Sequence, residues 1–251
     1  MFIDTHCHLS KRDYNDISNV IEENKKAGVE KIIISACTRE DLDETIEIIN
    51  AFSPVYATIG YHPEEADKII DIDLQRLESL LLTNKIVGIG EIGLDYHYST
   101  ENKEKQKELF EKQLALAEKY NLPVVIHTRE ATNDTITILK KYKVKGIIHC
   151  FSGSYETACQ YIKMGYLLGI GGVITFKNSH LKDTIKKLNL ENIVLETDSP
   201  YLSPVPYRGK INTSKNIPII AEFIASKLNL DTNIIANKTT KNALSLFTKL
   251  Q

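Results

Sequence analysis

The chain has 251 residues, 42% hydrophobic and 25% charged, with a formal net charge of −2. This composition is typical of a globular domain with a sizeable core, and the charge excludes a global basic field that would gather nucleic acid or acidic membrane. The four cysteines lack C-x-x-C spacing, which predicts a reducing, cytoplasmic location without a disulfide framework. Because there is no leader-like start and no bilayer-length apolar stretch, we expect neither secretion nor membrane insertion.

Eight short apolar runs alternate with amphipathic stretches along the chain. Strands are predicted at residues 2–6, 31–36, 55–60, 86–93, 123–127, 146–150, 166–172 and 192–198. Helices are predicted at residues 17–28, 41–50, 103–121 and 155–165, and one or two closing helices between Asn216 and Gln251. Eight alternations predict an α/β fold, a (β/α)8 TIM-type barrel, with a doubly wound sheet as the alternative. No linker interrupts the pattern, so we expect a single domain over residues 1–251.

The segment FIDTHCHL, residues 2–9, places two histidines one residue apart at the end of a predicted strand. Successive side chains of a strand point to opposite faces, so His6 and His8 are expected to face one way and Cys7 the other. Such a pair can bind one metal ion. Two surface or hydrogen-bonded histidines remain the commoner explanation of an isolated H-x-H.

Further potential metal ligands follow other predicted strands. The six candidates at strand ends are His6, His8, Glu91, His127, His149 and Asp198. In a barrel, the carboxyl ends of the strands meet at one rim, where active sites lie. One zinc ion needs only three protein ligands, so six candidates suggest two ions, and the two oxygens of Glu91 suit a bridge between ions roughly 3.5–4 Å apart. We therefore expect two divalent cations and leave their identity open among Zn, Mn and Mg, although the imidazole ligands favour zinc, manganese or iron.

The stretch GIGEIG, from Gly88 to Gly93, also fits the G-x-G-x-x-G pattern of dinucleotide-binding loops. That pattern requires a helix that begins at the loop, whereas LDYHYST follows here, and the carboxylate of Glu91 would repel phosphates. We expect instead that these glycines let the strand pack closely against its neighbours.

Several segments, taken together, resemble the signatures of the TatD family of metal-dependent deoxyribonucleases, within the amidohydrolase-like superfamily. They are IDTHCHL, GEIGLDY, PVVIHTREA, HCFSGS and VLETDSPYL...RGK, in the family's order from residue 2 to about residue 218. The resemblance implies a (β/α)8 fold, two divalent metals and hydrolysis of DNA phosphodiester bonds, often from the 3′ end. It also implies the distribution of the metal ligands: His6, His8 and Asp198 on one ion, His127 and His149 on the other, and Glu91 between them.

The sequence departs from the family pattern at three places outside the proposed ligands. Ser10 stands where the family usually has Asp or Asn, and Asn133 stands where an acidic residue is common. In this chain the N-x-P motif follows the RGK segment after more residues than is usual in the family. Either Asn212 or Asn216 can therefore correspond to the asparagine of that motif. These departures bear on substrate preference rather than on metal binding.

Two carboxylates are candidates for catalysis, and four further side chains are considered for substrate binding. With Glu91 as the bridge, Asp198 is expected to ligate and orient the attacking water or to accept its proton. Arg129 shares strand parity with His127 and can clamp a phosphate, the alternative being an ion pair with Glu130 or Asp134.

Arg208 and Lys210 lie on the segment after the last predicted strand, where barrels often bind phosphate. A solvated charged loop is nearly as good an explanation of these two cations. His62 also follows a predicted strand and is a candidate for substrate contact.

Three functions compete on these observations. The first is a metal-dependent deoxyribonuclease, with DNA as its partner, no membrane partner, and an oligomeric state left open, monomer included. The second is a phosphotriesterase, lactonase or amidohydrolase-type enzyme acting on a small molecule. Enzymes of that kind commonly bridge their two metals with a carboxylated lysine. The glutamate Glu91 at the corresponding position therefore favours the nuclease. The third, a noncatalytic nucleic-acid-binding module, is disfavoured by the mild negative charge and the lack of an aromatic stacking motif.

Overall fold

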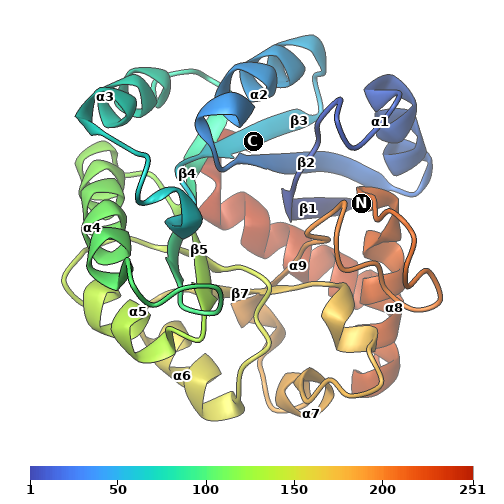
Figure 1. The fold of residues 1–251 in the computed structure, drawn as a ribbon. Helices are drawn as coiled ribbons and strands as arrows, with labels where there is room; N and C mark the ends of the chain where they lie inside the picture. Colours follow the sequence, from blue (N-terminus) through green and yellow to red (C-terminus); the bar gives the residue numbers. More distant parts are fainter. Residues whose placement is uncertain (251) are drawn as a thin grey trace. The chain divides into compact units, whose positions relative to one another are not determined.

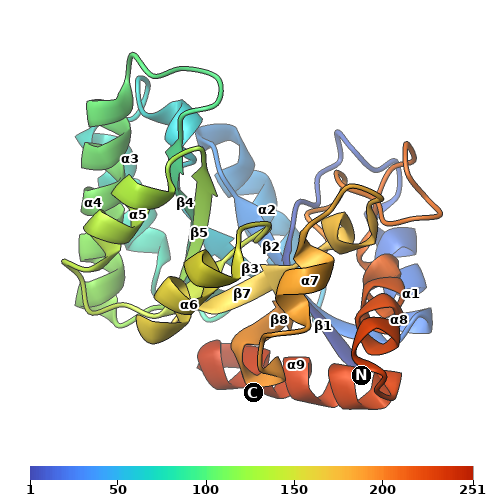
Figure 2. The same ribbon diagram turned by 90° about the horizontal axis from the view of Figure 1, so that it is seen from below.

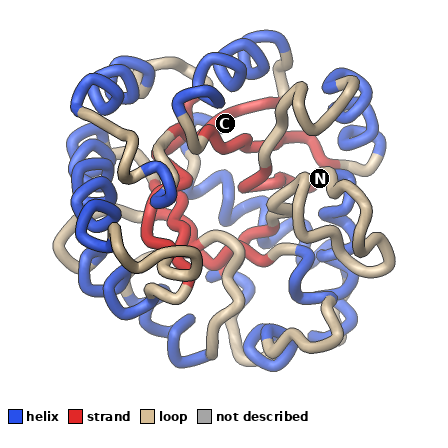
Figure 3. The backbone as a smooth tube through the Cα atoms, in the orientation of Figure 1, coloured by secondary structure: helices blue, strands red, loops and turns tan. Residues whose placement is uncertain are grey.

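The computed structural model of the protein describes residues 1–250 and shows a (β/α)8 TIM-type barrel fold (Figures 1 and 3). Its eight strands form one sheet in the order β1 to β8, alternating with helices, as the sequence predicts. The strands are β1 Phe2–Cys7, β2 Val29–Ala36, β3 Val55–Ile59, β4 Ile86–Asp95, β5 Val124–Arg129, β6 Gly146–Ile148, β7 Leu167–Ile170 and β8 Ile193–Leu195. This consecutive order excludes the doubly wound alternative, in which the strand order reverses.

The backbone groups into two compact units, which are described separately. Unit 1 comprises residues 1–34 and 149–246, and unit 2 comprises residues 35–148 and the end of the chain from Phe247. The helices of unit 1 are α1 Ile17–Lys26, α6 Tyr155–Lys163, α7 Leu181–Ile185, α8 Ile217–Leu228 and α9 Thr232–Leu246. Those of unit 2 are α2 Arg39–Ala51, α3 Asp71–Leu80, α4 Lys103–Tyr120 and α5 Thr132–Leu139. Among residues 1–250, no helix is both long and apolar enough to span a membrane.

In unit 1, the segment that follows β8 lies beside β1. Strand β1 pairs in parallel with β2, and β7 pairs in parallel with β8. Beyond the end of β8, the backbone N–H of Asp198 donates a hydrogen bond to the carbonyl of His6 at 3.0 Å. The N–H of His8 donates in turn to the carbonyl of Ser199 at 2.6 Å. The first and last parts of the barrel sequence are therefore held together where the candidate ligands lie.

The closing segment forms two helices, and the second of them covers the amino ends of β1 and β8. Thr240 Oγ1 donates to the carbonyl of Met1 at 3.2 Å, and Asn242 Nδ2 donates to the carbonyl of Ile193 at 2.8 Å. Figure 2 shows α9 running past the starts of both strands. The carboxyl ends of these strands, opposite α9, carry candidate metal ligands of unit 1.

In unit 2, strand β4 packs closely against its neighbours because of its glycines. A Cβ atom at Gly93 would lie 1.9 Å from the carbonyl oxygen of His127, and one at Gly88 would lie 2.6 Å from that of Pro123. The predicted role of these glycines is thus confirmed. The strand continues to Asp95 without a helix beginning at the glycines, which removes the structural basis for a dinucleotide-binding loop.

Helix ends follow the local sequence signals. The side chain of Thr38 accepts a hydrogen bond from the N–H of Asp41 in a capping box at the start of α2. At the start of α6, the side chain of Ser154 accepts a hydrogen bond from the N–H of Thr157. Caps of this kind stabilise a helix by about 1 kcal/mol. Gly28, with φ +81°, lies just beyond the end of α1, where the chain must leave the helix in a left-handed conformation.

Candidate metal centre

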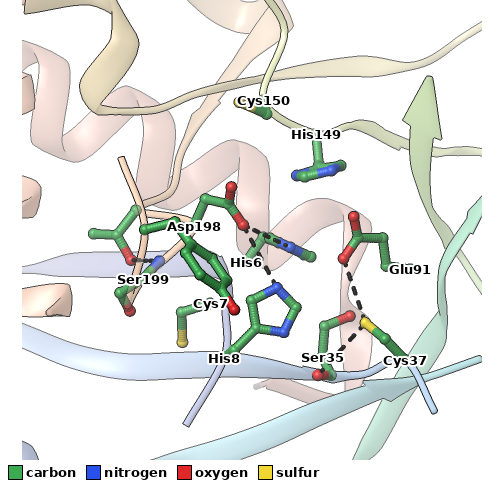
Figure 4. A network of polar contacts seen from close by, with 12 residues as sticks. His6, Cys7, His8, Ser35, Cys37, Glu91, His149, Cys150, Asp198 and Ser199 are labelled. Atoms are coloured by element: carbon green, nitrogen blue, oxygen red, sulfur yellow. Dashed lines mark hydrogen bonds and ion pairs between the residues drawn. The ribbon is translucent and has the colours of Figure 1, made fainter. Parts of the chain in front are cut away.

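Four side chains of unit 1, His6, His8, His149 and Asp198, form what is called here the unit 1 cluster. The Nε2 atoms of His6 and His8 each lie 3.5 Å from Oδ1 of Asp198, an arrangement visible in Figure 4. The rings of His6 and His149 are 4.2 Å apart between centroids. Ligand atoms of His6, His149 and Asp198 all lie within 4.8 Å of one another. Imidazole nitrogens and a carboxylate oxygen therefore converge on one point.

The alternation of side chains along β1 explains this convergence. His6 and His8 both face Asp198, whereas Cys7 is buried on the other face and its thiol donates to the carbonyl of Ile33 at 3.6 Å. The parity argument made from the sequence is thus confirmed. Asp198 has φ +54°, a left-handed backbone conformation that Asp tolerates better than most residues.

The charge state of Asp198 suits a metal ligand. Burial acts to raise its pKa, but hydrogen bonds with His6 and His8 hold the pKa well below its usual range, so the carboxylate is ionised at neutral pH. Two imidazoles with an ionised carboxylate form a donor set that suits zinc or manganese. The residues of the unit 1 cluster therefore fit a divalent cation.

Glu196 is a functional candidate that the sequence analysis passed over. It is fully buried, and its Oε1 accepts the backbone N–H of Cys150 at 2.5 Å and lies 3.8 Å from Nδ1 of His149. A Cβ at Gly169 would lie 2.0 Å from Oε2, so only glycine leaves room for this carboxylate. Glu196 thus lies directly behind the candidate ligand His149. In the sequence, only its position two residues before Asp198 pointed to a role at the site.

Burial raises the pKa of Glu196 to about 8, above its ordinary value of 4.5. Because its pKa is raised in the folded state, the Glu196 carboxyl makes its full contribution to the free energy of unfolding below pH 4.5, and this contribution is lost as the pH rises through 8. In chelator, we expect the melting temperature of the wild type to fall by a few degrees more than that of Glu196→Gln between pH 5 and pH 8.5. Calorimetry across this range measures the difference. The exposed Glu222→Gln on α8 should follow the wild type, and parallel curves for wild type and Glu196→Gln would contradict the prediction.

In unit 2, four side chains, His62, Glu91, Asp95 and His127, form the unit 2 cluster. Nδ1 of His127 lies 2.9 Å from Oε1 of Glu91, and its Nε2 lies 3.0 Å from Oδ2 of Asp95. Nε2 of His62 lies 3.7 Å from Oε1 of Glu91. The sequence-based candidates Glu91 and His127 are therefore adjacent, and His62 adjoins the same carboxylate.

The position of Glu91 in its strand corrects the prediction that it ends an apolar run. Strand β4 continues four residues further, to Asp95, and its register with β5 shifts between Ile89 and Ile92. Such an irregularity redirects a side chain without ending the strand. The other oxygen of Glu91, Oε2, accepts a hydrogen bond from the thiol of Cys37 at 3.3 Å (Figure 4). Each oxygen of the carboxylate thus has its own neighbour.

The two ring nitrogens of His127 have different carboxylate neighbours. Burial acts to lower the pKa of His127, but the hydrogen bonds to Asp95 and Glu91 raise it to about 9. Asp95 is buried and also accepts the backbone N–H of His97 at 2.8 Å, which fixes its orientation. A metal-binding histidine commonly donates its second N–H to a carboxylate in this way. Nε2–H of His127 on Asp95 would leave Nδ1, beside Glu91, for a cation.

Replacement of Asp95 by Asn is therefore expected to weaken metal binding by about 10- to 100-fold, the range typical of residues that orient a metal ligand. The variant keeps the side-chain shape but loses the charge that fixes the tautomer of His127. Calorimetric titration of the chelated protein with Zn²⁺ or Mn²⁺ measures the affinity. Asp67→Asn, which alters an exposed ion pair with Lys105 in the same unit, is the matched control. Equal affinities for both variants would show that Asp95 does not act through His127.

Arg129 lies at the end of β5, exposed, with its guanidinium over the ring of Tyr98 at 5.1 Å. Its alternative partners are engaged elsewhere: Glu130 pairs with His97 at 2.6 Å, and Asp134 pairs with Lys107 at 3.0 Å. The guanidinium of Arg129 is thus accessible to a solute and does not form the ion pair with Glu130 or Asp134 that was the alternative explanation.

Arg208 and the two candidate asparagines lie in unit 1. The guanidinium of Arg208 stacks on Phe176 at 3.7 Å from the ring centroid. Asn212 is fully buried and donates to the carbonyls of Thr197 and Tyr201, while Asn216 donates to Asn212 at 2.8 Å. Of the two asparagines, Asn212 is therefore the one that organises the segment after β8.

Comparison with known proteins identifies the family that the sequence motifs resemble. The TatD related DNase family matches residues 3–248. A Bacillus subtilis protein named as an uncharacterized metal-dependent hydrolase, YabD, is 41% identical over 98% of this chain and 99% of its own. The crystal structure of YjjV, a TatD homologue from Escherichia coli, matches with a TM-score of 0.91 and 32% identity, covering 98% of both chains. A TatD family hydrolase from Entamoeba histolytica matches with a TM-score of 0.88 and 26% identity, covering 99% of this chain and 98% of its own. The chain therefore belongs to the TatD family of metal-dependent hydrolases.

Proposed function

We propose that the protein is a deoxyribonuclease that hydrolyses DNA phosphodiester bonds with two divalent cations, acting in the manner of a 3′–5′ exonuclease. The observation that carries the proposal is that each unit holds its own cluster of imidazole and carboxylate donors, in a chain of the TatD family. The four reduced cysteines are consistent with a cytoplasmic enzyme.

Each proposed ligand has a defined place in its cluster. His6, His8 and Asp198 are proposed to hold one ion, and Glu91 and His127 to hold the other, with His149 as a further ligand. When bound, the cations would supply positive charge that polarises a phosphoryl oxygen and lowers the pKa of water. Asp198, ionised at neutral pH, is proposed to orient the attacking water or to accept its proton.

Arg129 is proposed to bind a substrate phosphate, because its guanidinium is exposed and held over Tyr98 rather than neutralised by Glu130 or Asp134. A guanidinium matches two phosphate oxygens in a bidentate contact. A small neutral substrate, such as a lactone, would make no use of this cation, so Arg129 distinguishes the nuclease from the second function considered above.

Replacement of Arg129 by Ala is expected to lower kcat/KM for DNA by about 10- to 100-fold, which corresponds to the loss of one hydrogen-bonded charge worth roughly 1.5–3 kcal/mol. Hydrolysis of a neutral ester should change much less. Kinetics on a short labelled oligonucleotide and on the ester, with the metal content of each variant measured, provide the test.

Arg76→Ala, which breaks an exposed ion pair with Asp43 in the same unit, is the matched control for this test. Equal losses on both substrates would show that Arg129 is structural. If the metal-loaded wild type hydrolyses the ester but no oligonucleotide, the proposed nuclease activity is overturned in favour of a small-molecule hydrolase.

A further inference from the structure

Thr197 directly precedes the proposed ligand Asp198 and is fully buried in unit 1. We propose that Thr197 is a positioning residue: its hydroxyl, anchored by the buried carboxylate of Asp4, holds the backbone of Asp198 in the conformation that makes it a metal ligand. Asp4 and Thr197 together are called here the Asp4–Thr197 clamp. The inference rests on the proposed role of Asp198 as a metal ligand and adds the residues that set the geometry of that ligand.

The backbone of Asp198 has a conformation that requires support. Its φ is +54°, in the left-handed region, where the Cβ atom of any residue but glycine crowds the following carbonyl oxygen. Such a conformation persists only where the surrounding structure holds it. With this backbone, Oδ1 of Asp198 lies 3.5 Å from Nε2 of both His6 and His8 (Figure 4). The place of the carboxylate therefore depends on the groups that hold residue 198.

The hydroxyl of Thr197 makes one hydrogen bond as an acceptor and one as a donor. It accepts the backbone N–H of Ser199 at 3.2 Å and donates to Oδ2 of Asp4 at 2.6 Å. A hydroxyl has one donor and two acceptor positions, so both bonds can exist together. The first bond closes a turn around Asp198, a local contact that threonine often makes with the residue two positions on. The second bond fixes that turn to β1.

Asp4 anchors both segments that carry the candidate ligands. It lies on β1 and is fully buried. Its Oδ1 accepts the backbone N–H of Thr197 at 3.1 Å and that of His6 at 3.3 Å. A buried carboxylate needs donors of this kind to offset its loss of water. One carboxylate thus fixes the backbone of His6 and the backbone that leads into Asp198.

Packing alone does not explain a hydroxyl at position 197. A valine would have nearly the same shape, and it would bury no polar group that needs partners. The backbone N–H of Asp198 donates to the carbonyl of His6 at 3.0 Å, which sets the spacing of the two segments. The hydroxyl adds a link between residues 197 and 199, across Asp198 itself. We therefore assign it to the conformation of Asp198 rather than to the filling of the core.

Loss of this hydroxyl should act on the metal through geometry. Thr197→Val keeps every proposed ligand but releases the turn around Asp198. Replacement of a residue that orients a metal ligand typically costs about 10- to 100-fold in metal affinity or activity. Because Asp198 is also proposed to orient the attacking water or to accept its proton, kcat should fall at saturating metal, with KM little changed.

Calorimetric titration of the chelated protein with Mn²⁺ tests the inference. We expect Thr197→Val to bind Mn²⁺ about 10- to 100-fold more weakly than the wild type. Thr197→Ser, which keeps the hydroxyl, should bind like the wild type. The matched control is Thr239→Val on α9, which removes another buried threonine hydroxyl of unit 1, one that donates to the carbonyl of Ile235 at 2.8 Å. This control should leave the affinity unchanged.

Asp4→Asn provides a second variant in case Thr197→Val does not fold. It keeps the shape of the anchor but replaces one accepting oxygen by an amide group that only donates. We expect its affinity for Mn²⁺ to fall about tenfold or more. Its control is Asp16→Asn at the start of α1 in the same unit, because asparagine is an equally good cap for a helix.

Hydrogen exchange in chelator gives a readout that needs neither metal nor DNA. The backbone N–H of Ser199 donates to the hydroxyl of Thr197, so its exchange should be faster in Thr197→Val than in the wild type. Thr197→Ser should exchange this proton at the rate of the wild type. Unchanged exchange at Ser199 in Thr197→Val would show that the hydroxyl does not hold the turn.

The inference is overturned if Thr197→Val or Asp4→Asn binds Mn²⁺ like the wild type. It is equally overturned if Thr197→Ser loses the metal to the same extent as Thr197→Val, or if Thr239→Val weakens binding as much. Failure of the proposed function gives a different result: the variants keep the expected order of Mn²⁺ affinities, but the wild type cleaves no DNA with any divalent metal.

Discussion

Removal of divalent metal by a chelator is expected to reduce DNA hydrolysis by the purified protein to the uncatalysed background. Every donor in the two clusters is an imidazole nitrogen or a carboxylate oxygen, and these side chains alone offer no strong electrophile to polarise a phosphoryl group. Addition of Mn²⁺, Mg²⁺ or Zn²⁺ should restore activity to different extents, because imidazole-rich ligands favour manganese and zinc over magnesium. Turnover of a labelled oligonucleotide and bound metal are measured on the same samples.

Two variants of β1 test whether the clusters account for this metal. His6→Ala should lose bound metal, since its imidazole faces Asp198 at 3.5 Å. Cys7→Ser should retain it, since the thiol is buried on the opposite face against the carbonyl of Ile33. Full activity in chelator, in protein shown to be free of metal, would contradict the prediction, and equal loss of metal from both variants would contradict the assignment of faces.

Replacement of Glu91 by Ala is expected to leave a folded protein whose kcat/KM for DNA is lowered by more than about 100-fold. Loss of a residue that merely orients a ligand costs about 10- to 100-fold, so loss of a ligand itself should exceed that range. Stability should change little, because β4 is held by its backbone pairing and by its close contacts with β5. Circular dichroism, metal analysis and turnover, measured together, separate unfolding from loss of the metal.

Glu104→Ala, at the exposed start of α4, serves as the control for Glu91→Ala, since it removes a carboxylate of the same unit outside the cluster. It should retain metal and turnover. Activity of the Glu91 variant within tenfold of the wild type would be incompatible with a bridging or ligating role for this carboxylate.

The alternation of faces in a strand made the unit 1 cluster predictable. Once β1 was recognised, the directions of His6, Cys7 and His8 followed from the geometry of a strand, and the structure bears this out. The close packing of the glycines in β4 was predictable for the same local reason.

The supporting residues were not predictable in this way. Parity gives the face on which a side chain lies but not the distance to a residue on another strand. Asp95 lies 3.0 Å from His127 because β4 continues past Glu91, and Cys37 reaches Glu91 from the end of β2. Both contacts depend on strand register, which is set by tertiary packing rather than by any single segment.

Three helices were also missing from the elements identified in the sequence. Helix α5 is rich in Thr and Ile, residues that disfavour helices, and α7 has only five residues, too few to show a periodicity. Helix α3 begins at Asp71, after its N-cap residue Ile70, and the exposed Ile70 and Ile72 obscure the apolar face. Tertiary packing forms these helices in spite of weak local signals.

The buried side chain of Asn212 has a consequence for how sites of this kind diversify. By donating to the carbonyls of both Thr197 and Tyr201, it fixes the two ends of the segment Pro200–Asn212 immediately beside Asp198. We therefore expect that the stretch between Tyr201 and Asn212 can be replaced without displacing Asp198, provided that these two hydrogen bonds are kept. Such a replacement would change the surface beside a proposed metal ligand and leave the position of that carboxylate unaltered.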